Sequence, residues 1–196
     1  MAITELDQLD LDKSYSYADY LTWRLQERLE LLRGKIALMS PAPNLYHQKI
    51  VGKLHIFVGS FLLHQPCQVF VAPFDVRLPI GKHRSNEETY TVVQPDICVV
   101  CDDSKLDEQG CKGAPDLVVE VLSPGNTRRE MRDKFTLYEE AGVKEYWMVD
   151  PTYQAVNRFL LNEEGIFIGK RPLTDQEILK TDLLPGLEIE LAEVFA

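Results

Sequence analysis

Long hydrophobic runs are missing from this chain of 196 residues, and none approaches the roughly 18 apolar residues of a membrane-spanning helix. The first residues, MAITELDQLDLDK, lack the basic and then apolar regions of a secretory signal peptide. Cysteine is also scarce, and without a secretory signal the four cysteines are expected to be reduced thiols. Together these absences predict a cytoplasmic protein without a membrane segment.

Positive charge is in short supply, because 21 Lys and Arg stand against 31 Asp and Glu, for a formal net charge of −10. This balance argues against indiscriminate coating of nucleic acid or of an anionic membrane. Residues 1–30 carry −4 and residues 175–196 carry −5, which leaves −1 for residues 31–174. The central region is therefore compatible with a polyanionic substrate.

Several common catalytic signatures are absent as well. The sequence has no Walker phosphate loop, no glycine-rich nucleotide fingerprint after a strand and no Ser-His-Asp order. The spacing Cys98-x-x-Cys101 suggests zinc, together with Cys67 and Cys111, but residues three apart in a strand point to opposite faces. We therefore exclude a zinc site of these cysteines.

The pattern of apolar residues predicts an α/β fold, a mixed central sheet flanked by helices, in a single domain over residues 1–196. Residues 1–14 form a polar leader, and residues 152–196 are rich in expected strands. The expected helices are amphipathic and cover 15–25, 44–63 and 127–141, with Thr127 as the cap of the last. The expected strands cover 28–32, 35–39, 69–78, 92–101, 117–122 and 145–149, followed by a hairpin over 154–171 and a short strand after 184–186, with a polar loop over 102–114.

Glu120 is the most informative residue, since it lies inside the most apolar strand, LVVEVL. An ionised carboxylate there costs several kcal/mol unless it is paired, protonated or bound to a cation. Asp96 opens another valine-rich strand. If the two strands are neighbours, the two carboxylates converge as oxygen ligands for a hard divalent cation. The alternatives for Glu120 are a buried salt bridge or a strand with one face open to solvent, and the alternative for Asp96 is a local backbone-capping role.

Lys134 lies at the edge of the buried stripe of its helix, between Met131 and Tyr138. A lysine aimed at two carboxylates can steady a nucleophilic water and neutralise charge on a transferring phosphoryl group. The alternative is a surface lysine paired with Glu130.

At this point the residues resemble a known family. The runs SPAPNLYH, PFDVRLP, TVVQPDICVV, APDLVVEVLSPGNTRREMRDKFTLYEEAGVKEYWMVDP and LLPGLEIELAEVF are similar to the Uma-two family of predicted endonucleases. That family belongs to the PD-(D/E)XK restriction-endonuclease-like superfamily, and the resemblance covers roughly residues 15–196. It implies a restriction-endonuclease-like fold and Mg²⁺- or Mn²⁺-dependent hydrolysis of nucleic acid, with DNA as the expected substrate.

Residue by residue, Pro95-Asp96 matches the PD of the motif and Glu120 matches its (D/E). Leu122 stands where the motif has lysine, and the resemblance implies that Lys134 of the following helix supplies it. Asp96, Glu120 and Lys134 are thus the expected catalytic residues, and the two acids the expected metal ligands. A homodimer is expected by analogy with nucleases that cut two strands.

Three further residues are candidates for the site. Glu30, an acid within an apolar strand, matches the family and is placed at the outer edge of a metal site. His47 also matches, although a histidine on the buried side of its helix is more often a core residue. Asp116 shares strand parity with Glu120 and is a further candidate ligand, but a role at the start of the strand is expected. Asp150, before a proline, is expected to be a turn residue.

Two other functions stay open at this stage. The same core can be a catalytically inactive binding or assembly module, or a metal-dependent hydrolase of small phosphoesters. The position of Lys134 discriminates the enzyme from the module, because direct chemistry requires its ammonium to lie within hydrogen-bond reach of the acids or one water away.

Overall fold

The computed structural model describes residues 2–39, 44–79, 85–123 and 128–196. The expected helix cap at Thr127 lies outside these residues. None of the helices in the described ranges combines the length and the apolar character needed to cross a bilayer.

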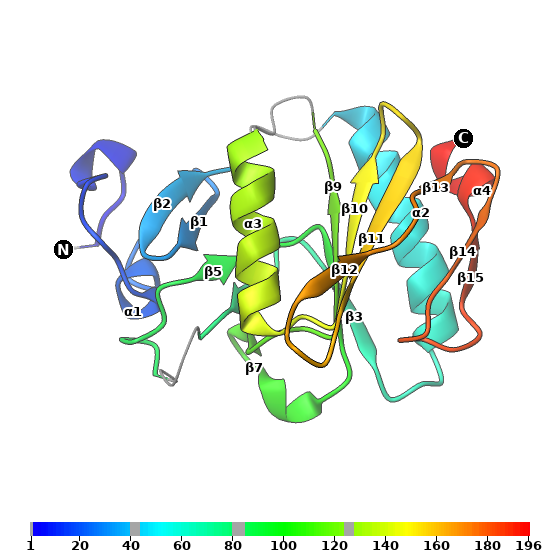
Figure 1. Ribbon diagram of the computed structural model, residues 1–196. Coiled ribbons are helices and arrows are strands. Elements are labelled where there is room, and N and C mark those ends of the chain that lie inside the picture. Colours follow the sequence, from blue (N-terminus) through cyan, green and yellow to red (C-terminus); the bar gives the residue numbers. More distant parts are fainter. Residues whose placement is uncertain (1, 40–43, 80–84, 124–127) are drawn as a thin grey trace.

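Two larger sheets organise the chain (Figure 1). The N-terminal sheet has the order β2 (Lys35–Leu38), β1 (Leu29–Leu32), β5 (Val92–Val93), β4 (Val76–Arg77), β8 (Gly110–Lys112) and β7 (Leu106–Asp107). The central sheet has the order β12 (Phe167–Gly169), β11 (Ala155–Leu161), β10 (Glu145–Asp150), β9 (Leu117–Val121), β6 (Ile97–Val100) and β3 (Gln68–Val71), with β13 (Leu173–Thr174) beside β11. A separate hairpin pairs β14 (Ile178–Lys180) with β15 (Glu188–Glu190).

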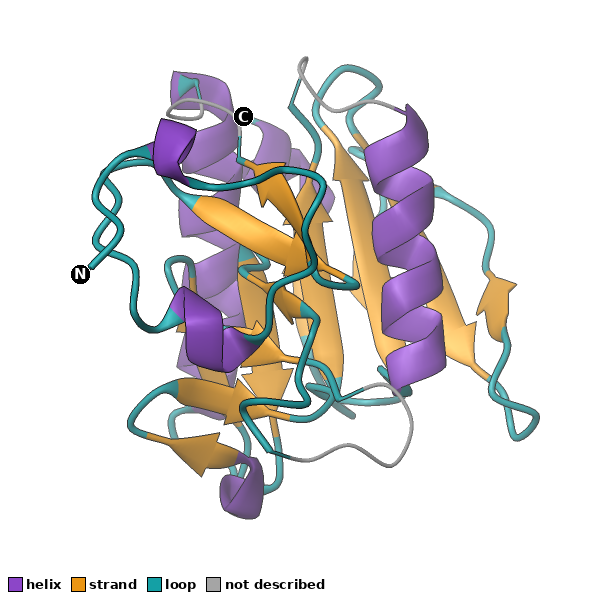
Figure 2. Ribbon diagram, turned by 90° about the vertical axis from the view of Figure 1, so that its left-hand side faces the viewer, coloured by secondary structure: helices purple, strands orange, loops and turns teal. Residues whose placement is uncertain are grey.

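The central sheet is mixed, because β9 runs parallel to β10 and antiparallel to β6. Helix α2 (Leu45–Leu62) packs on one face of this sheet, and α3 (Arg128–Ala141) covers the other (Figures 1 and 2). Strands covered on both faces are nearly continuous apolar runs, which explains the valine-rich segments. The predicted α/β fold is confirmed. The predicted pairing of the two strands is also confirmed, since β6, which follows Asp96, pairs with β9, which contains Glu120.

The alternation of side chains along β9 decides where its acid points. Leu117, Val119 and Val121 belong to the core on the α2 side, whereas Val118 belongs to the core that contains Tyr138 of α3. Residues two apart in a strand share a face. Glu120 therefore lies on the α3 side, where α3 and the N-terminal sheet both approach the central sheet.

The two long helices begin and end for local reasons. Asn44 caps α2, because its side-chain oxygen accepts a hydrogen bond of 2.8 Å from the backbone N–H of His47. The buried face of α2 includes Ile50, Leu54 and Val58. Gly142 ends α3 with a φ of +86°, a left-handed conformation that favours glycine.

Shorter helical segments are Leu6–Gln8, α1 (Tyr17–Tyr20), Asp103–Lys105 and α4 (Leu191–Phe195).

Two expected strands, 69–78 and 92–101, are wrong as single elements, since each splits into one strand of each sheet. The first becomes β3 and β4, and the second becomes β5 and β6. The breaks contain Pro73 and Pro95, which have no backbone N–H to donate to a sheet ladder. As a result Asp96 lies at the crossing from the N-terminal to the central sheet, directly before β6. The expected polar loop over 102–114 also contains β7 and β8.

The expectation of reduced thiols is wrong for one pair of cysteines. Cys67 and Cys101 form a disulfide between β3 and β6. These strands are antiparallel neighbours with Gln68 opposite Val100, so the two cysteines just beyond this pair face each other. The pairing register brings together residues 34 apart in sequence, which the cysteine count could not reveal. The described free cysteines, Cys98 and Cys111, are buried.

Candidate active site

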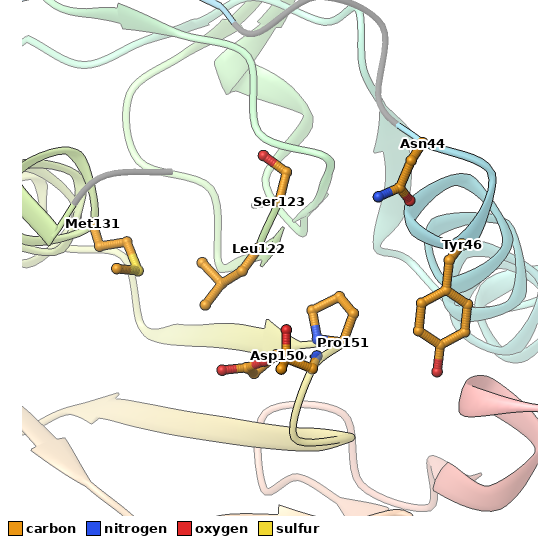
Figure 3. Close-up of a pocket in the computed structure, with 8 residues that line it drawn as sticks. Asn44, Tyr46, Leu122, Ser123, Met131, Asp150 and Pro151 are labelled. Carbon is orange, nitrogen blue, oxygen red and sulfur yellow. Dashed lines mark hydrogen bonds between the residues drawn. The ribbon is translucent and has the colours of Figure 1, made fainter. Parts of the chain in front are cut away.

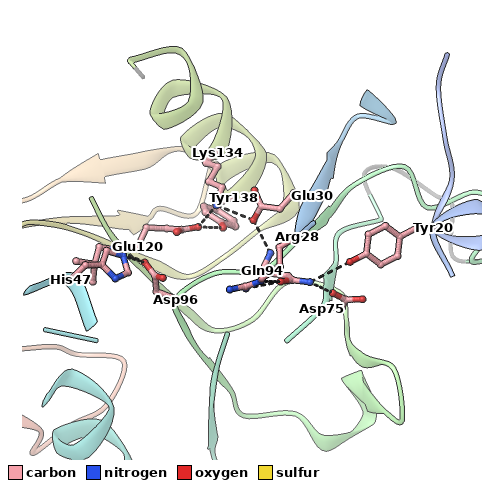
Figure 4. A network of polar contacts seen from close by, with 11 residues as sticks. Tyr20, Arg28, Glu30, His47, Asp75, Gln94, Asp96, Glu120, Lys134 and Tyr138 are labelled. Carbon is pink, nitrogen blue, oxygen red and sulfur yellow. Dashed lines mark hydrogen bonds and ion pairs between the residues drawn. The ribbon is translucent and has the colours of Figure 1, made fainter. Parts of the chain in front are cut away.

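Four charged side chains from four segments converge beside the central sheet (Figure 4). Glu120 comes from β9, Glu30 from β1, and Lys134 from α3. Asp96 comes from the crossing just before β6. The structure therefore brings together all three expected catalytic residues and the additional candidate Glu30.

Lys134 joins acids from both sheets. Its Nζ donates to Glu120 Oε1 over 2.8 Å and to Glu30 Oε1 over 3.0 Å. Burial favours the neutral amine, but the two carboxylates outweigh burial and raise the pKa of Lys134 well above its ordinary value. The ammonium consequently stays protonated in the neutral range and provides a fixed positive charge.

Tyr138 adds a second donor to the same carboxylate. Its hydroxyl donates to Glu120 Oε1 over 2.6 Å. Tyr138 follows Lys134 by four residues, so both side chains project from one side of α3. The sequence interpretation treated Tyr138 as a core residue, although its spacing from Lys134 was the signal that could have identified it.

Glu120 is poised between its charged and neutral forms. Burial is the largest influence and raises its pKa, Lys134 lowers it, and the nearby Asp96 and Glu30 raise it again. The result is a pKa of about 7, compared with an ordinary value of 4.5. The neutral form of this carboxyl group therefore persists to a higher pH than in an exposed glutamate.

Asp96 is tied to the strand that carries Glu120. Its Oδ2 accepts a hydrogen bond of 2.8 Å from the backbone N–H of Val121, the residue after Glu120. The same oxygen lies 3.3 Å from Nε2 of the buried His47. Burial alone would lower the pKa of His47, but the Asp96 carboxylate outweighs it and the net shift is upward. His47 is thus buried as expected and also contacts an expected catalytic acid.

A cleft of about 590 Å³ lies beside these groups. Its charged and polar lining includes Arg28, Glu30, His47, Gln94, Asp96, Glu120 and Lys134. A smaller pocket of about 340 Å³ adjoins it and shares Asn44, Leu122, Ser123 and Met131 with it (Figure 3). In the smaller pocket Asp150 Oδ1 accepts the backbone N–H groups of Thr152 and Tyr153, the turn role predicted for it.

Gln94 and Arg28 were missed as candidate site residues. Gln94 directly precedes Pro95-Asp96, and its backbone N–H donates to Glu30 Oε1 over 2.8 Å. Its side-chain oxygen accepts from Arg28 Nη2 over 2.8 Å. A neutral amide next to an acidic motif has no chemistry that would mark it as a site residue in the sequence.

Asp116 is not part of this cluster. It lies just before β9, at the opposite end of the strand from Glu120. Its Oδ2 accepts the backbone N–H of Cys101 over 2.8 Å, and its Oδ1 lies 2.7 Å from Lys144 Nζ. These contacts join the start of β9 to neighbouring segments.

The donor set determines which metal the residues fit. Among the described residues, no three His, Cys, Asp or Glu side chains gather closely enough to enclose an ion. Asp96 and Glu120 nevertheless offer carboxylate oxygens in the cleft. Mg²⁺ is commonly bound by one or two carboxylates, with waters and substrate phosphates completing the shell. The residues therefore fit Mg²⁺ or Mn²⁺ with substrate oxygens as further ligands, and do not fit a closed zinc site.

Comparisons with known proteins show what this chain is similar to. Residues 17–192 match the sequence model of the family described as "Uma2: Putative restriction endonuclease". A Synechocystis protein called "Uncharacterized protein slr1290" is 28% identical over 150 residues, which are 75% of this chain and 74% of that protein. The crystal structure of "a putative nuclease belonging to DUF820" from Anabaena variabilis has a TM-score of 0.70 at 18% identity, covering 92% of this chain and 97% of that one. This structural likeness concerns the fold.

Proposed function

Because the chain belongs to the Uma2 family of restriction-endonuclease-like proteins, we propose that it is a metal-dependent endonuclease that hydrolyses phosphodiester bonds in nucleic acid, with DNA as the expected substrate. Family membership supports a nuclease-like function in general. The observation that carries the finer proposal is the contact of Lys134 Nζ with both Glu120 and Glu30, beside Asp96.

In this proposal Asp96 and Glu120 hold Mg²⁺ or Mn²⁺. When bound, such an ion polarises a phosphate and lowers the pKa of a bound water. Ionised Glu120 is the form that accepts a cation, and its pKa of about 7 allows this form near neutral pH. Glu120 therefore needs no unusual pH to act as a ligand.

The remaining groups act on orientation and charge. Lys134 offers ammonium protons that orient the attacking water and stabilise negative charge as it develops on the phosphate. Glu30 restrains the ammonium through the bond of 3.0 Å from Lys134 Nζ. Tyr138 holds the Glu120 carboxylate in one orientation through its hydroxyl. Glu30 and Tyr138 are thus positioning residues.

The alternative function, an inactive binding or assembly module, would be favoured by a Lys134 far from the acids. The distance of 2.8 Å from Lys134 Nζ to Glu120 Oε1 favours the enzyme instead. Although Leu122 stands where the motif has lysine, α3 brings an ammonium to the carboxylates. A homodimer and a cytoplasmic location stay predictions, which light scattering and cell fractionation test respectively.

A plasmid-nicking assay tests the proposal. Supercoiled DNA is incubated with the protein in Mg²⁺, Mn²⁺ or EDTA, and the variants Glu120→Gln and Lys134→Ala are compared with wild type. The exposed Glu193 and Lys170 provide the matched controls Glu193→Gln and Lys170→Ala. Circular dichroism verifies that each variant is folded.

We expect nicking by wild type and both controls only with a divalent cation, and losses of about 10²-fold or more in the two site variants. Full activity of Lys134→Ala would contradict the catalytic assignment. Cation and DNA binding by wild type without any cleavage would support the module instead.

A further inference from the structure

Arg28 is an exposed arginine directly before β1 that lines the cleft of the acids. Its Nη2 donates to Gln94 Oε1 over 2.8 Å and its Nε to the same oxygen over 3.3 Å. These bonds use two of the five N–H groups of a guanidinium. Within the described part of the chain the other N–H groups have no hydrogen-bond partner, so they can donate to a further acceptor at the rim of the cleft.

Gln94 is held so that it can only present an acceptor to Arg28. Its side-chain Nε2 donates to Asp75 Oδ1 over 2.8 Å and to the Tyr20 hydroxyl over 3.3 Å. The carboxamide oxygen must then point the other way, toward the guanidinium. Gln94 is only 8% exposed, so its packing resists rotation of the amide.

The side-chain partner of Arg28 is the neutral Gln94, so within the described residues the guanidinium forms no ion pair. Among the described residues, no carboxylate lies within the ion-pair distance of 4.0 Å from Arg28. The cleft otherwise holds the carboxylates of Glu30, Asp96, Glu120 and Glu130 against the single ammonium of Lys134. Such a surface repels a phosphate chain unless a cation at its rim offsets the acids.

Gln94 also fixes where Arg28 lies relative to Lys134. Glu30 Oε1 accepts both the backbone N–H of Gln94 and Nζ of Lys134. Arg28, Gln94, Glu30 and Lys134 thus form one continuous chain of hydrogen bonds. In Figure 4, Arg28 lies on the Glu30 side of Lys134, while Asp96 lies on the other side.

We propose that Arg28, held by Gln94, binds a backbone phosphate of the nucleic acid next to the phosphate that is cleaved. A planar guanidinium matches a phosphate with two parallel hydrogen bonds, which an ammonium cannot reproduce. Gln94 is the positioning residue that presents it. This inference rests on the proposed function and names a contact of the same site with its substrate.

Binding measured without cleavage tests the inference. Anisotropy of a fluorescent 20-base-pair DNA is recorded in EDTA between 50 and 200 mM KCl. Wild type is compared with Arg28→Gln, Arg28→Lys and Gln94→Leu. Arg171→Gln is the matched control, because Arg171 is exposed, pairs with Glu177 and lies outside the cleft. Urea unfolding of each variant separates loss of binding from loss of folding.

We expect Arg28→Gln to weaken binding about tenfold, and to lower the slope of log affinity against log salt by about 1, the value for one phosphate contact. Arg28→Lys should keep the slope but lose affinity, since the charge remains without the fork. Gln94→Leu should likewise keep the slope and lose affinity. Arg171→Gln should leave both values close to those of wild type.

An Arg28→Gln slope equal to that of wild type, or a change matched by Arg171→Gln, would overturn the inference. The absence of any DNA binding by the wild-type protein would overturn it too. Failure here is separable from failure of the proposed function. If the protein nicks DNA but its DNA affinity does not depend on Arg28, only the proposed Arg28–phosphate contact is wrong. If DNA binding depends on Arg28 but no nicking occurs, the proposed endonuclease activity is wrong.

Discussion

Replacing Glu120 by glutamine should remove a large pH dependence of stability. The pKa of Glu120 in the folded protein is about 7, compared with an ordinary value of 4.5. Between pH 4.5 and pH 7 the folded state therefore binds a proton that the unfolded state has released. The stabilisation by this proton is complete below pH 4.5 and is lost as the pH rises through 7. At 1.36 kcal/mol per pKa unit, the interval corresponds to about 3 kcal/mol. The Glu120 side chain is only 13% exposed, so solvent screening reduces this free-energy difference little.

The assay is urea unfolding of wild type and Glu120→Gln at several pH values from 4.5 to 8.5, in EDTA. Glutamine keeps the shape of the protonated acid and cannot ionise. The free energy of unfolding of wild type, relative to the variant, should therefore fall by about 3 kcal/mol across this range. Glu193→Gln, at an exposed position, is the control and should run parallel to wild type. A difference between wild type and Glu120→Gln that does not change with pH would refute the reasoning.

Added Mg²⁺ or Mn²⁺ should reverse the effect at high pH. A ligand that binds only the folded state stabilises it by about 2.7 kcal/mol at a concentration of 100 times its Kd. The gain should appear in wild type above pH 7 and be largely lost in Glu120→Gln. Equal stabilisation of the two proteins would place cation binding elsewhere.

Three further predictions concern the lysine and the scaffold. Lys134→Arg should restore little of the nicking that Lys134→Ala loses, because a planar fork fills the position of a compact ammonium poorly; wild-type rates for the arginine variant in the plasmid assay would show that only charge matters. Leu54→Ala should lower the free energy of unfolding by about 2–5 kcal/mol, since Leu54 is fully buried against the central sheet; urea titration measures the loss, and a value near zero would contradict the packing of α2. Asn44→Ala should cost about 1 kcal/mol through the lost cap of α2, while an unchanged urea midpoint would show that the bond to His47 contributes nothing.

Much of the central sheet and its helices could be predicted from sequence, because their signals are local. The periodicity after Asn44 predicts α2 almost to the residue, and Gly142 marks the end of α3. The crossings at Pro73 and Pro95 could not be predicted as changes of sheet. A valine-rich segment has the same local propensity whether it belongs to one sheet or to two.

In the candidate site, too, some residues could be predicted from the sequence and others could not. An acid inside an apolar strand is conspicuous, so Glu120 stands out in the sequence, and the following helix brings Lys134 back over it. Tyr138 and Gln94 do not stand out, because a ring in an apolar stripe and a neutral amide are ordinary residues until their partners are known. The Cys67–Cys101 bond depends on the register of two strands, which neither segment specifies alone.

The bonds of Lys134 and Gln94 to Glu30 span 104 and 64 residues of chain. Contacts this distant in sequence form only after a large loop has closed, and such closure is slow compared with the formation of a helix or a hairpin. During synthesis, moreover, the acids of both sheets leave the ribosome before the lysine that joins them. A nascent chain therefore holds Glu30 and Glu120 without the lysine that contacts both of them until α3 has been made. The hydrogen bonds of Lys134 to Glu30 and Glu120 therefore form only when the chain has been synthesised as far as α3 and α3 has packed against both sheets.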